Sequence, residues 1–435
     1  MTAVRTRRHL DSHTADAGGF TAHAVRLATV PLVEVRLRLP MPMPGPRGVA
    51  AAEVAAEVLF GHAAPARAES ARRGGYLVAA ADQDHLCVAA TAPAAALAAL
   101  LREIGSAIDR PAPGRDAVRA AIHDLSEAGR AGADDSDVVA TATALRSAYG
   151  DASPYAYEWP GPELIGTLSP DEVLAGCSGI TTAGGSIAIV GDVVPQDAVG
   201  LVEQFLGHLG RAPVPVPALP PAVTGSRNIA VHRPGAAQTT LRRVLVVPHD
   251  RRGTGRATDG AAWRVCDLVF GGQPSSRLAR TLREDHGYAY IARSRLVRRP
   301  RATDLRIITD VGLSVTAEAV TLLDEVTRSM AEGVTDTERT VAGDFAAGAV
   351  VMSHGGQSDL AGLLSQELGL GRAAHAVDDD VSLLAGVTPC ALDASARQLA
   401  AGHWHTVLVS DLDRIDGGTL PALGGAGWTV AAVES

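Results

Sequence analysis

The chain has 435 residues, 46% of them hydrophobic and 20% charged, which is typical of a globular protein and excludes a disordered one. This length favours two domains of roughly 200 residues each. The net charge of −9 argues against a broad nucleic-acid surface, and no apolar run reaches the roughly 18 residues of a membrane span. The N-terminus has charges but no apolar stretch after them, so we expect a cytoplasmic protein without a secretory signal.

The first half of the chain alternates between strand and helix patterns. Residues 23–40 predict two strands joined near Pro31, and residues 76–91 predict two more with a turn at 82–84. Residues 186–193 predict a buried strand. Helices are expected at residues 49–60, 94–109, 116–129 and 136–148, from Ser169, and from Pro195. Glu172 is placed to form a capping box with Ser169.

The strand expected at residues 33–39 places apolar side chains on one face and charged side chains on the other. Val33, Val35, Leu37 and Leu39 alternate with the charged residues Glu34, Arg36 and Arg38. Such alternation predicts a sheet with one covered face and one solvated face.

A proline-rich segment divides the chain almost equally. Five prolines fall within residues 211–223, so this segment should be extended and lie outside any helix or central strand. We therefore expect an N-terminal domain at residues 1–210, a linker at 211–224 and a C-terminal domain at 225–435.

The second half repeats the order of the first. Strands are expected at residues 228–234, 240–248, 288–297, 305–312, 404–413 and 429–433, and helices at 260–270, 275–285, 316–333, 336–352, 357–370 and 394–403. The phrases GSIAIVGDVVP and HTVLVSDLDR occupy matching places late in the two halves. The sequence thus predicts an α+β fold of two duplicated domains, each with a helix-covered sheet rich in antiparallel strands.

The four cysteines lie far apart and form no Cys-x-x-Cys pair, which argues against a cysteine zinc site and predicts buried free thiols: Cys87, Cys177, Cys266 and Cys390. His403 and His405 are spaced to chelate a metal, but no third ligand is in view, so ordinary packing or surface exposure is favoured. The arginine-rich run at residues 293–301 indicates a solvated strand or loop edge.

Residues 270–294, FGGQPSSRLARTLREDHGYAYIARS, are the most informative segment. They resemble the second-domain signature of the M16 zinc peptidases, the family of insulinase, pitrilysin and mitochondrial processing peptidase. Residues 153–173, 185–207, 233–243 and 332–348 also resemble M16 segments, in the correct order and spacing. The resemblance implies two related α+β domains joined by a linker, and chains that usually pair around a chamber.

The zinc motif of that family, His-x-x-Glu-His, occurs nowhere in the chain. In the matching helix, Glu53 and Glu57 occupy the places of the two histidine ligands, and Ala56 that of the general base. The place of the third ligand falls near His123 and Asp124. Without imidazoles or a base, we expect no bound metal, and the glutamate pair is best explained as a solvated helix face.

The resemblance also implies a catalytic role at the substrate for Arg283 and Tyr290, which have the family's seven-residue spacing. A guanidinium can hold a peptide carbonyl or carboxylate, and a phenol can donate to an oxyanion. Outside this context, Arg283 would pair with Glu284 or Asp285 and Tyr290 would lie in the core.

The glycine-serine turn before this helix is the expected substrate-binding backbone, at Gly271, Gly272, Ser275 and Ser276. The two serines are also candidate helix N-caps. The Gly-Gly step is not a phosphate loop, since it lacks Gly-Lys-Ser/Thr.

These features imply a non-catalytic, zinc-less subunit of a heterodimeric M16-type peptidase. A zinc-bearing homologue would supply the metal and this chain the Arg/Tyr pair, acting on a peptide or unfolded polypeptide held by strand addition. The alternatives are a metal-free binding or assembly protein and a self-sufficient enzyme with an unorthodox metal site.

Overall fold

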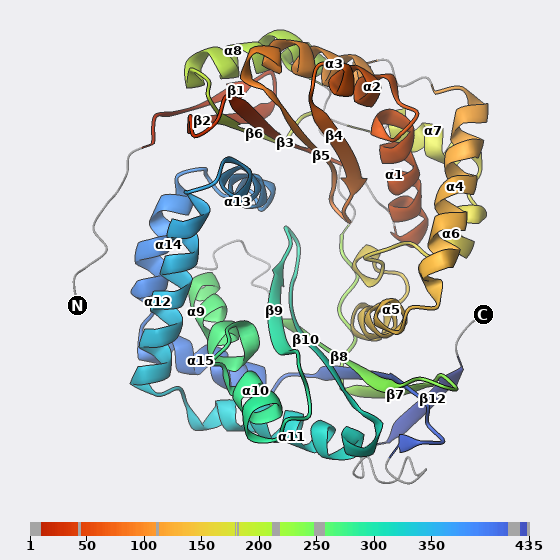
Figure 1. The fold of residues 1–435 in the computed structure, drawn as a ribbon, viewed down its shortest axis with the longest axis vertical. Coiled ribbons are helices and arrows are strands. Elements are labelled where there is room, and N and C mark those ends of the chain that lie inside the picture. The colour runs from red at the N-terminus through yellow and green to blue at the C-terminus, as the bar shows by residue number, and fades with distance from the viewer. Residues whose placement is uncertain are drawn as a thin grey trace. The chain divides into compact units, whose positions relative to one another are not determined.

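The computed structural model describes residues 10–41, 45–109, 113–178, 180, 182–210, 218–247, 257–415 and 427–432. The chain forms two compact units (Figure 1). Unit 1 contains the described residues of Met1–Ala131, Glu158–Ala218 and Val351–Asp379, and unit 2 the remainder. Of the expected linker, residues 211–217 lie outside the described ranges, and residues 218–224 have neither helix nor strand.

Unit 1 is built on a six-stranded sheet of order β1-β2-β6-β3-β5-β4. Its strands are β1 (Ser12–Ala17), β2 (Phe20–Arg26), β3 (Leu32–Pro40), β4 (Tyr76–Ala81), β5 (His85–Pro93) and β6 (Gly185–Gly191). Only the β2–β6 pair is parallel among these neighbours. The strand β1 was not expected, because its polar residues give no apolar alternation.

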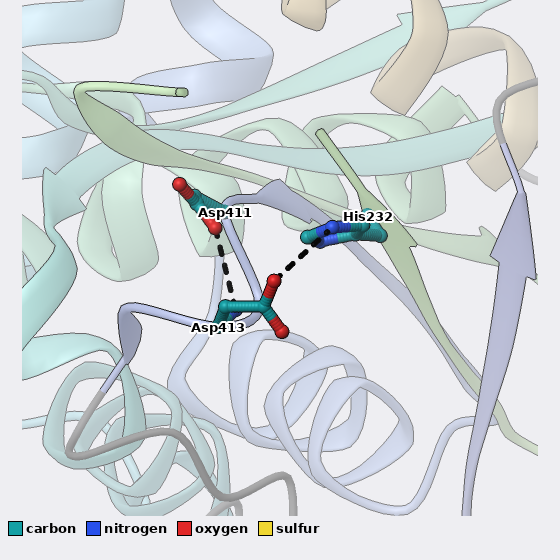
Figure 2. A group of neighbouring side chains, drawn as sticks. All are labelled: His232, Asp411 and Asp413. Atoms are coloured by element: carbon teal, nitrogen blue, oxygen red, sulfur yellow. Dashed lines mark hydrogen bonds and ion pairs between the residues drawn. The ribbon is translucent and has the colours of Figure 1, made fainter. Parts of the chain in front are cut away.

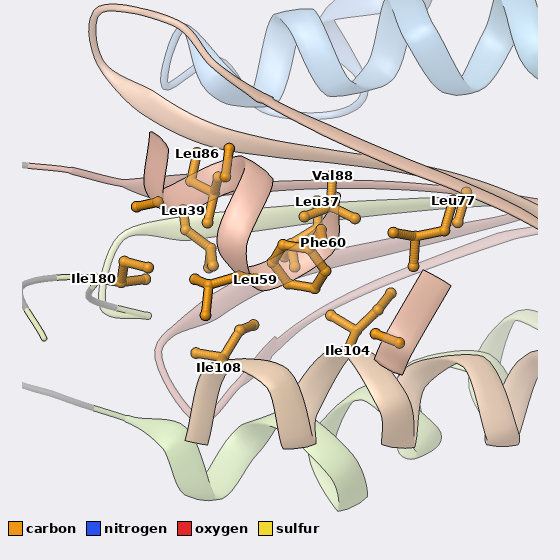
Figure 3. Packing of buried hydrophobic residues seen from close by; sticks show 14 of the residues in the cluster. Leu37, Leu39, Leu59, Phe60, Leu77, Leu86, Val88, Ile104, Ile108 and Ile180 are labelled. Carbon is orange, nitrogen blue, oxygen red and sulfur yellow. The ribbon is translucent and has the colours of Figure 1, made fainter. Parts of the chain in front are cut away.

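Helices pack on one face of this sheet and close the core. They include α1 (Gly45–Phe60), α2 (Pro65–Arg72), α3 (Leu97–Asp109), α6 (Pro162–Gly166), α7 (Pro170–Ser178) and α8 (Pro195–Leu206), and α4 (Arg115–Ala133) follows α3. Figure 3 shows Phe60 of α1 and Ile104 of α3 against Leu37, Leu77 and other strand residues. The predicted capping box is present, since the Ser169 and Glu172 side chains each accept a hydrogen bond from the other's backbone N–H.

The second face of this sheet is also covered, so the prediction of one solvated face is wrong. Helix α13 (Gln357–Gly369) packs on β3 and β6. Arg36 donates to Ser358 Oγ at 2.9 Å and Arg38 to Ser365 Oγ at 3.0 Å. The polar residues of β3 therefore face a helix that lies some 320 residues further along the sequence.

Unit 2 repeats this sheet. The strands are β7 (Arg227–His232), β8 (Gln238–Val247), β9 (Ala292–Arg298), β10 (Thr303–Gly312), β11 (Trp404–Ser410) and β12 (Trp428–Ala432), in the order β12-β7-β11-β8-β10-β9. The series β7-β11-β8-β10-β9 corresponds strand for strand to β2-β6-β3-β5-β4, including one parallel pair. The two-domain α+β prediction with an internal duplication is therefore confirmed.

The other helices of the second half complete the fold. They are α9 (Ala257–Asp267), α10 (Arg277–Ala279), α11 (Thr316–Ser329), α12 (Asp336–Ser353), α14 (Ala376–Ala385) and α15 (Pro389–Ala400). Two π-helical segments, η4 (Leu268–Gly272) and η5 (Arg280–Asp285), stand where the sequence predicted regular helix. Among the described residues, no helix is both long and apolar enough to cross a membrane.

Each unit contains one helix from the half of the chain that forms most of the other unit. Helix α5 (Ser136–Tyr149) comes from the first half but packs on β8 and β11 in unit 2, as α13 packs on the equivalent strands β3 and β6 in unit 1. The units therefore differ from the expected division at residues 210 and 225 by one exchanged segment each.

A buried carboxylate anchors α5 in unit 2. Asp304 on β10 is fully buried, pairs with Arg299 and Arg306, and accepts a hydrogen bond from the Tyr149 hydroxyl at 2.9 Å. Burial alone would raise the pKa of Asp304, but the two guanidinium charges outweigh it and hold the pKa below its ordinary value. The carboxylate is thus ionised and fully committed to these partners.

A second buried carboxylate, Asp267 at the end of α9, fixes the edge strand β9. Its side chain accepts hydrogen bonds from the Ser294 hydroxyl and from the Leu296 backbone N–H, the latter at 3.1 Å. Burial raises the pKa of Asp267 to about 6, against the opposing effect of these two hydrogen bonds.

Replacing Asp304 by Asn should lower the free energy of unfolding by about 3–5 kcal/mol, because it leaves two arginines without their buried counter-charge. Tyr149→Phe removes one hydrogen bond to a charged group and should lower it by about 1.5–3 kcal/mol. Urea denaturation measures both. Asp324→Asn, which removes a half-exposed partner of Arg243, is the control and should have the smallest effect. An Asp304→Asn protein as stable as this control would contradict the assignment.

The raised pKa of Asp267 predicts a pH dependence of stability. The folded-state pKa of about 6 lies above the ordinary value of 3.8, so the stabilising contribution is present below about pH 4 and is lost as pH rises through 6. Wild type should therefore lose up to about 3 kcal/mol between pH 4 and pH 7 relative to Asp267→Asn. Parallel urea titrations of the two proteins across this range measure the difference. A constant difference between them would contradict the prediction.

Candidate functional site

The middle of helix α1 holds the residues at the place of the zinc motif. Ala56 is buried, and Glu53 is half-buried on the same helix. The Glu53 carboxylate accepts a hydrogen bond from the Ala81 backbone N–H at 3.0 Å. Burial, and to a lesser degree the charge of Glu57, raises the pKa of Glu53. The expectation of a solvated helix face is therefore wrong for Glu53, which is bonded to strand β4.

The Glu57 carboxylate is also bonded to backbone. It accepts from the N–H of His62, just beyond the end of α1, at 3.0 Å. His123 and Asp124 on α4 are exposed. With no imidazole at 53 or 57, no base at 56 and both carboxylates engaged by N–H donors, these residues do not fit a catalytic zinc ion.

Strand β4, to which Glu53 is bonded, is one edge of the unit 1 sheet. The Asp82 N–H donates to the His85 carbonyl at 2.9 Å. This bond shows which residues of β4 direct their backbone groups toward β5 and which direct them away from it. In an antiparallel ladder every second residue turns its N–H and C=O away from the partner strand. For β4 these are Leu77, Ala79 and Ala81, and the Ala81 N–H is the donor to Glu53.

Arg283 and Tyr290 lie in unit 2 on an exposed segment that begins in η5. Arg283 pairs with Glu284 at 3.1 Å, and its side chain is 43% exposed. Tyr290 is 90% exposed, so it does not belong to the core. The backbone around it is held, because the N–H groups of Tyr288 and Ala289 both donate to the Leu282 carbonyl.

The glycine-serine turn before η5 has mainly structural roles. A Cβ on Gly271 would approach Leu278 and Ser294 to 2.6 Å, so glycine is needed there for packing. Ser276 is buried and its hydroxyl accepts from the Ala279 N–H, as an N-cap does. Gly272 is half-buried, and Ser275 is exposed.

A cluster of possible metal ligands that the sequence analysis missed lies at the ends of the parallel strands β7 and β11. Figure 2 shows His232, Asp411 and Asp413 together. The imidazole Nδ1 accepts a hydrogen bond from the Leu412 N–H at 3.1 Å, so Nε2 carries the proton of the neutral ring. Asp411 accepts from the Gly235 N–H at 2.9 Å. These hydrogen bonds join the ends of β7 and β11, and this structural role accounts for the cluster without a bound metal.

His405 is buried and packs against α5, so it is not placed as a metal ligand. Its Nδ1 lies 2.9 Å from the Ser147 hydroxyl on α5, and burial lowers its pKa to about 4. The packing interpretation is confirmed for this residue, whereas His403 is exposed.

The four cysteines are free thiols, as predicted. Cys177 and Cys266 are buried, and burial raises the pKa of the Cys177 thiol to about 11. Cys390 is exposed, so the expectation that every thiol is buried is wrong there.

One family model matches part of the chain. Residues 186–342 match the family model described as the peptidase M16 inactive domain. A comparison with curated proteins gives no match.

Solved structures share the fold over nearly the whole chain. A peptidase M16 inactive domain from Pseudomonas fluorescens is 18% identical, with a TM-score of 0.78 and coverage of 92% of this chain and 98% of that one. A protease from Helicobacter pylori is 16% identical, with a TM-score of 0.79 and coverage of 92% and 99%. A chain of complex III2 from Candida albicans is 10% identical, with a TM-score of 0.72 and coverage of 92% and 96%.

Residues 186–342 are similar to the peptidase M16 inactive domain, within a chain that has the same two-domain fold as those structures and lacks the His-x-x-Glu-His motif.

Proposed function

We propose that the chain is the zinc-less subunit of a two-chain M16-type peptidase. A zinc-bearing homologue supplies the metal, and this chain contributes peptide contacts and the pair Arg283 and Tyr290. The observation that carries the proposal is the 90% exposure of Tyr290 on a segment whose backbone is held in place.

The position of Tyr290 suits a group that acts on another molecule. Its neighbour Ala289 is buried, so the segment is anchored in unit 2 while the ring points into solvent. A tyrosine has an apolar ring and a polar hydroxyl, and it is enriched where one protein covers another. At a partner's zinc site, the phenol would donate a hydrogen bond to the oxyanion that develops on the scissile carbonyl.

Arg283 suits the binding of the peptide itself. Its present partner Glu284 is half-exposed, and exposed ion pairs of this kind are weak. The guanidinium can therefore exchange Glu284 for a substrate carbonyl or carboxylate, which it would hold by forked hydrogen bonds.

The free edge of β4 supports a role in holding an extended peptide. Ala79 is half-buried and turns its backbone N–H and C=O groups away from β5, and a peptide strand can pair with such groups. Two similar structures are described as proteases, one from Helicobacter pylori and one periplasmic from Escherichia coli. The second covers 92% of this chain but only 46% of its own length is matched.

The alternative is a metal-free binding or assembly protein with no role in proteolysis. The similarity to a chain of complex III2 favours it, because that fold occurs there within a large assembly. Under this alternative, Arg283 and Tyr290 would have no effect on any peptidase activity.

Tyr290→Phe should reduce the turnover of the reconstituted pair about 10²–10³-fold, the scale of removing one oxyanion donor. Arg283→Ala should mainly raise KM, because it removes binding to the ground-state peptide. Steady-state kinetics with a fluorogenic peptide measure both effects.

Two neighbours give matched controls. The Tyr288 hydroxyl donates to Glu318 at 2.5 Å, so Tyr288→Phe removes a phenol that is already engaged. Arg280 is an exposed arginine of the same segment, so Arg280→Ala matches the loss of charge. Unchanged melting temperatures would separate activity from folding. Full activity of Tyr290→Phe and Arg283→Ala would favour the assembly alternative.

A further inference from the structure

Unit 1 contains a cavity of about 570 Å³ that lies away from α1 and β4. One wall is formed by strands β1, β2 and β6, and the other by α13 and the segment after it, through residue 377. This volume is in the range of ligand pockets in proteins. The wall on α13 is apolar, because Leu360, Leu364 and Leu368 recur every four residues on one side of the helix.

The strand wall of the cavity ends at a sheet edge. Strand β1 pairs only with β2 among the described residues, and the Arg26 N–H donates to the Asp11 carbonyl at 2.8 Å. This bond fixes the alternation of the ladder, so Ser12, Thr14 and Asp16 turn their backbone groups away from β2. All three residues are exposed.

The free edge and the cavity meet at the same residues. Ser12 and Thr14 present backbone groups to the edge, and both line the cavity. In a strand added beside β1, the residues opposite Ser12 and Thr14 would place their side chains on that same face of the sheet. Those side chains would enter the cavity toward the leucines of α13.

The hydrogen-bonding groups of the cavity lining favour one kind of polar peptide side chain. Its titratable residues are all basic: His23, His354, Arg372 and His375. No aspartate or glutamate is among the lining residues described, although Arg372 pairs with the buried Glu367 behind the wall. An aliphatic side chain suits the leucine wall, and a carboxylate can accept hydrogen bonds from the imidazole and guanidinium N–H groups.

We propose that the β1 edge and this cavity bind an extended acidic peptide as an added strand, with one aliphatic and one carboxylate side chain in the cavity. The site lies at the opposite edge of the sheet from β4. All the residues of this site come from this chain, and the site needs neither zinc nor a partner. The binding proposal can therefore be tested independently of the proposed peptidase role.

The test uses the full chain and a fluorescein-labelled heptapeptide of sequence Thr-Leu-Thr-Glu-Thr-Leu-Thr. Fluorescence anisotropy should show saturable binding. A matched peptide with Lys in place of Glu should bind about tenfold more weakly, a difference of about 1.4 kcal/mol.

Variants at the two edges identify the site. Thr14→Pro removes the outward N–H of β1, which an edge strand tolerates, and should weaken binding about tenfold. Thr14→Val removes the same hydroxyl, including its 2.7 Å contact with His23, but keeps the N–H, and should bind like wild type. Ala79→Pro removes an outward N–H of β4 and should also leave binding unchanged.

The exposed His375 provides a variant that does not touch the strand. His375→Glu adds a negative charge at the cavity and should weaken binding of the acidic peptide while strengthening that of the lysine peptide. Absence of saturable binding overturns the proposal. So does equal binding by Thr14→Pro and wild type, or a loss of binding in Ala79→Pro as large as in Thr14→Pro.

Discussion

Each six-stranded sheet depends on a helix from the other half of the chain to cover its second face. Helix α13 lies on β3 and β6, and α5 lies on the equivalent strands β8 and β11. The covered faces are polar, and these helices supply hydrogen-bonding side chains to them. Arg36 reaches Ser358 in unit 1, and Tyr149 reaches Asp304 in unit 2. Because the partners come from distant sequence, neither half is a self-contained domain.

In helix α1, a residue at the expected place of the zinc motif has a structural role. Where a metal ligand would stand, Glu53 accepts a hydrogen bond from the outermost N–H of β4. This bond uses one backbone donor of the β4 edge but leaves the half-buried Ala79 with its backbone groups turned outward. Glu53 therefore joins helix α1 to the edge strand. Arg283 and Tyr290, in the other unit, are exposed, as the proposed contact with a partner requires.

Local patterns predicted most of the fold, and long-range contacts account for the errors. Periodicity placed β3 and α3, and the Ser169–Glu172 spacing predicted a cap that the structure contains. Charged residues at alternate positions of β3 suggested a face exposed to solvent. This prediction was wrong because helix α13, about 320 residues further along the chain, covers that face. Strand β1 was missed since it has no apolar alternation. The motif located Arg283 and Tyr290, but only the structure gives their exposure. The basic cavity and the His232 cluster join distant segments, so no local pattern marks them.

In the function that we propose, this chain completes an active site that it does not itself contain. The most direct measurement is a titration of this chain into a fixed amount of a zinc-bearing M16 homologue from the same organism, followed by cleavage of a fluorogenic peptide. The account predicts that neither chain cleaves alone and that activity rises until the two are equimolar. Cleavage by this chain alone, or homologue activity that does not change as this chain is added, would contradict it.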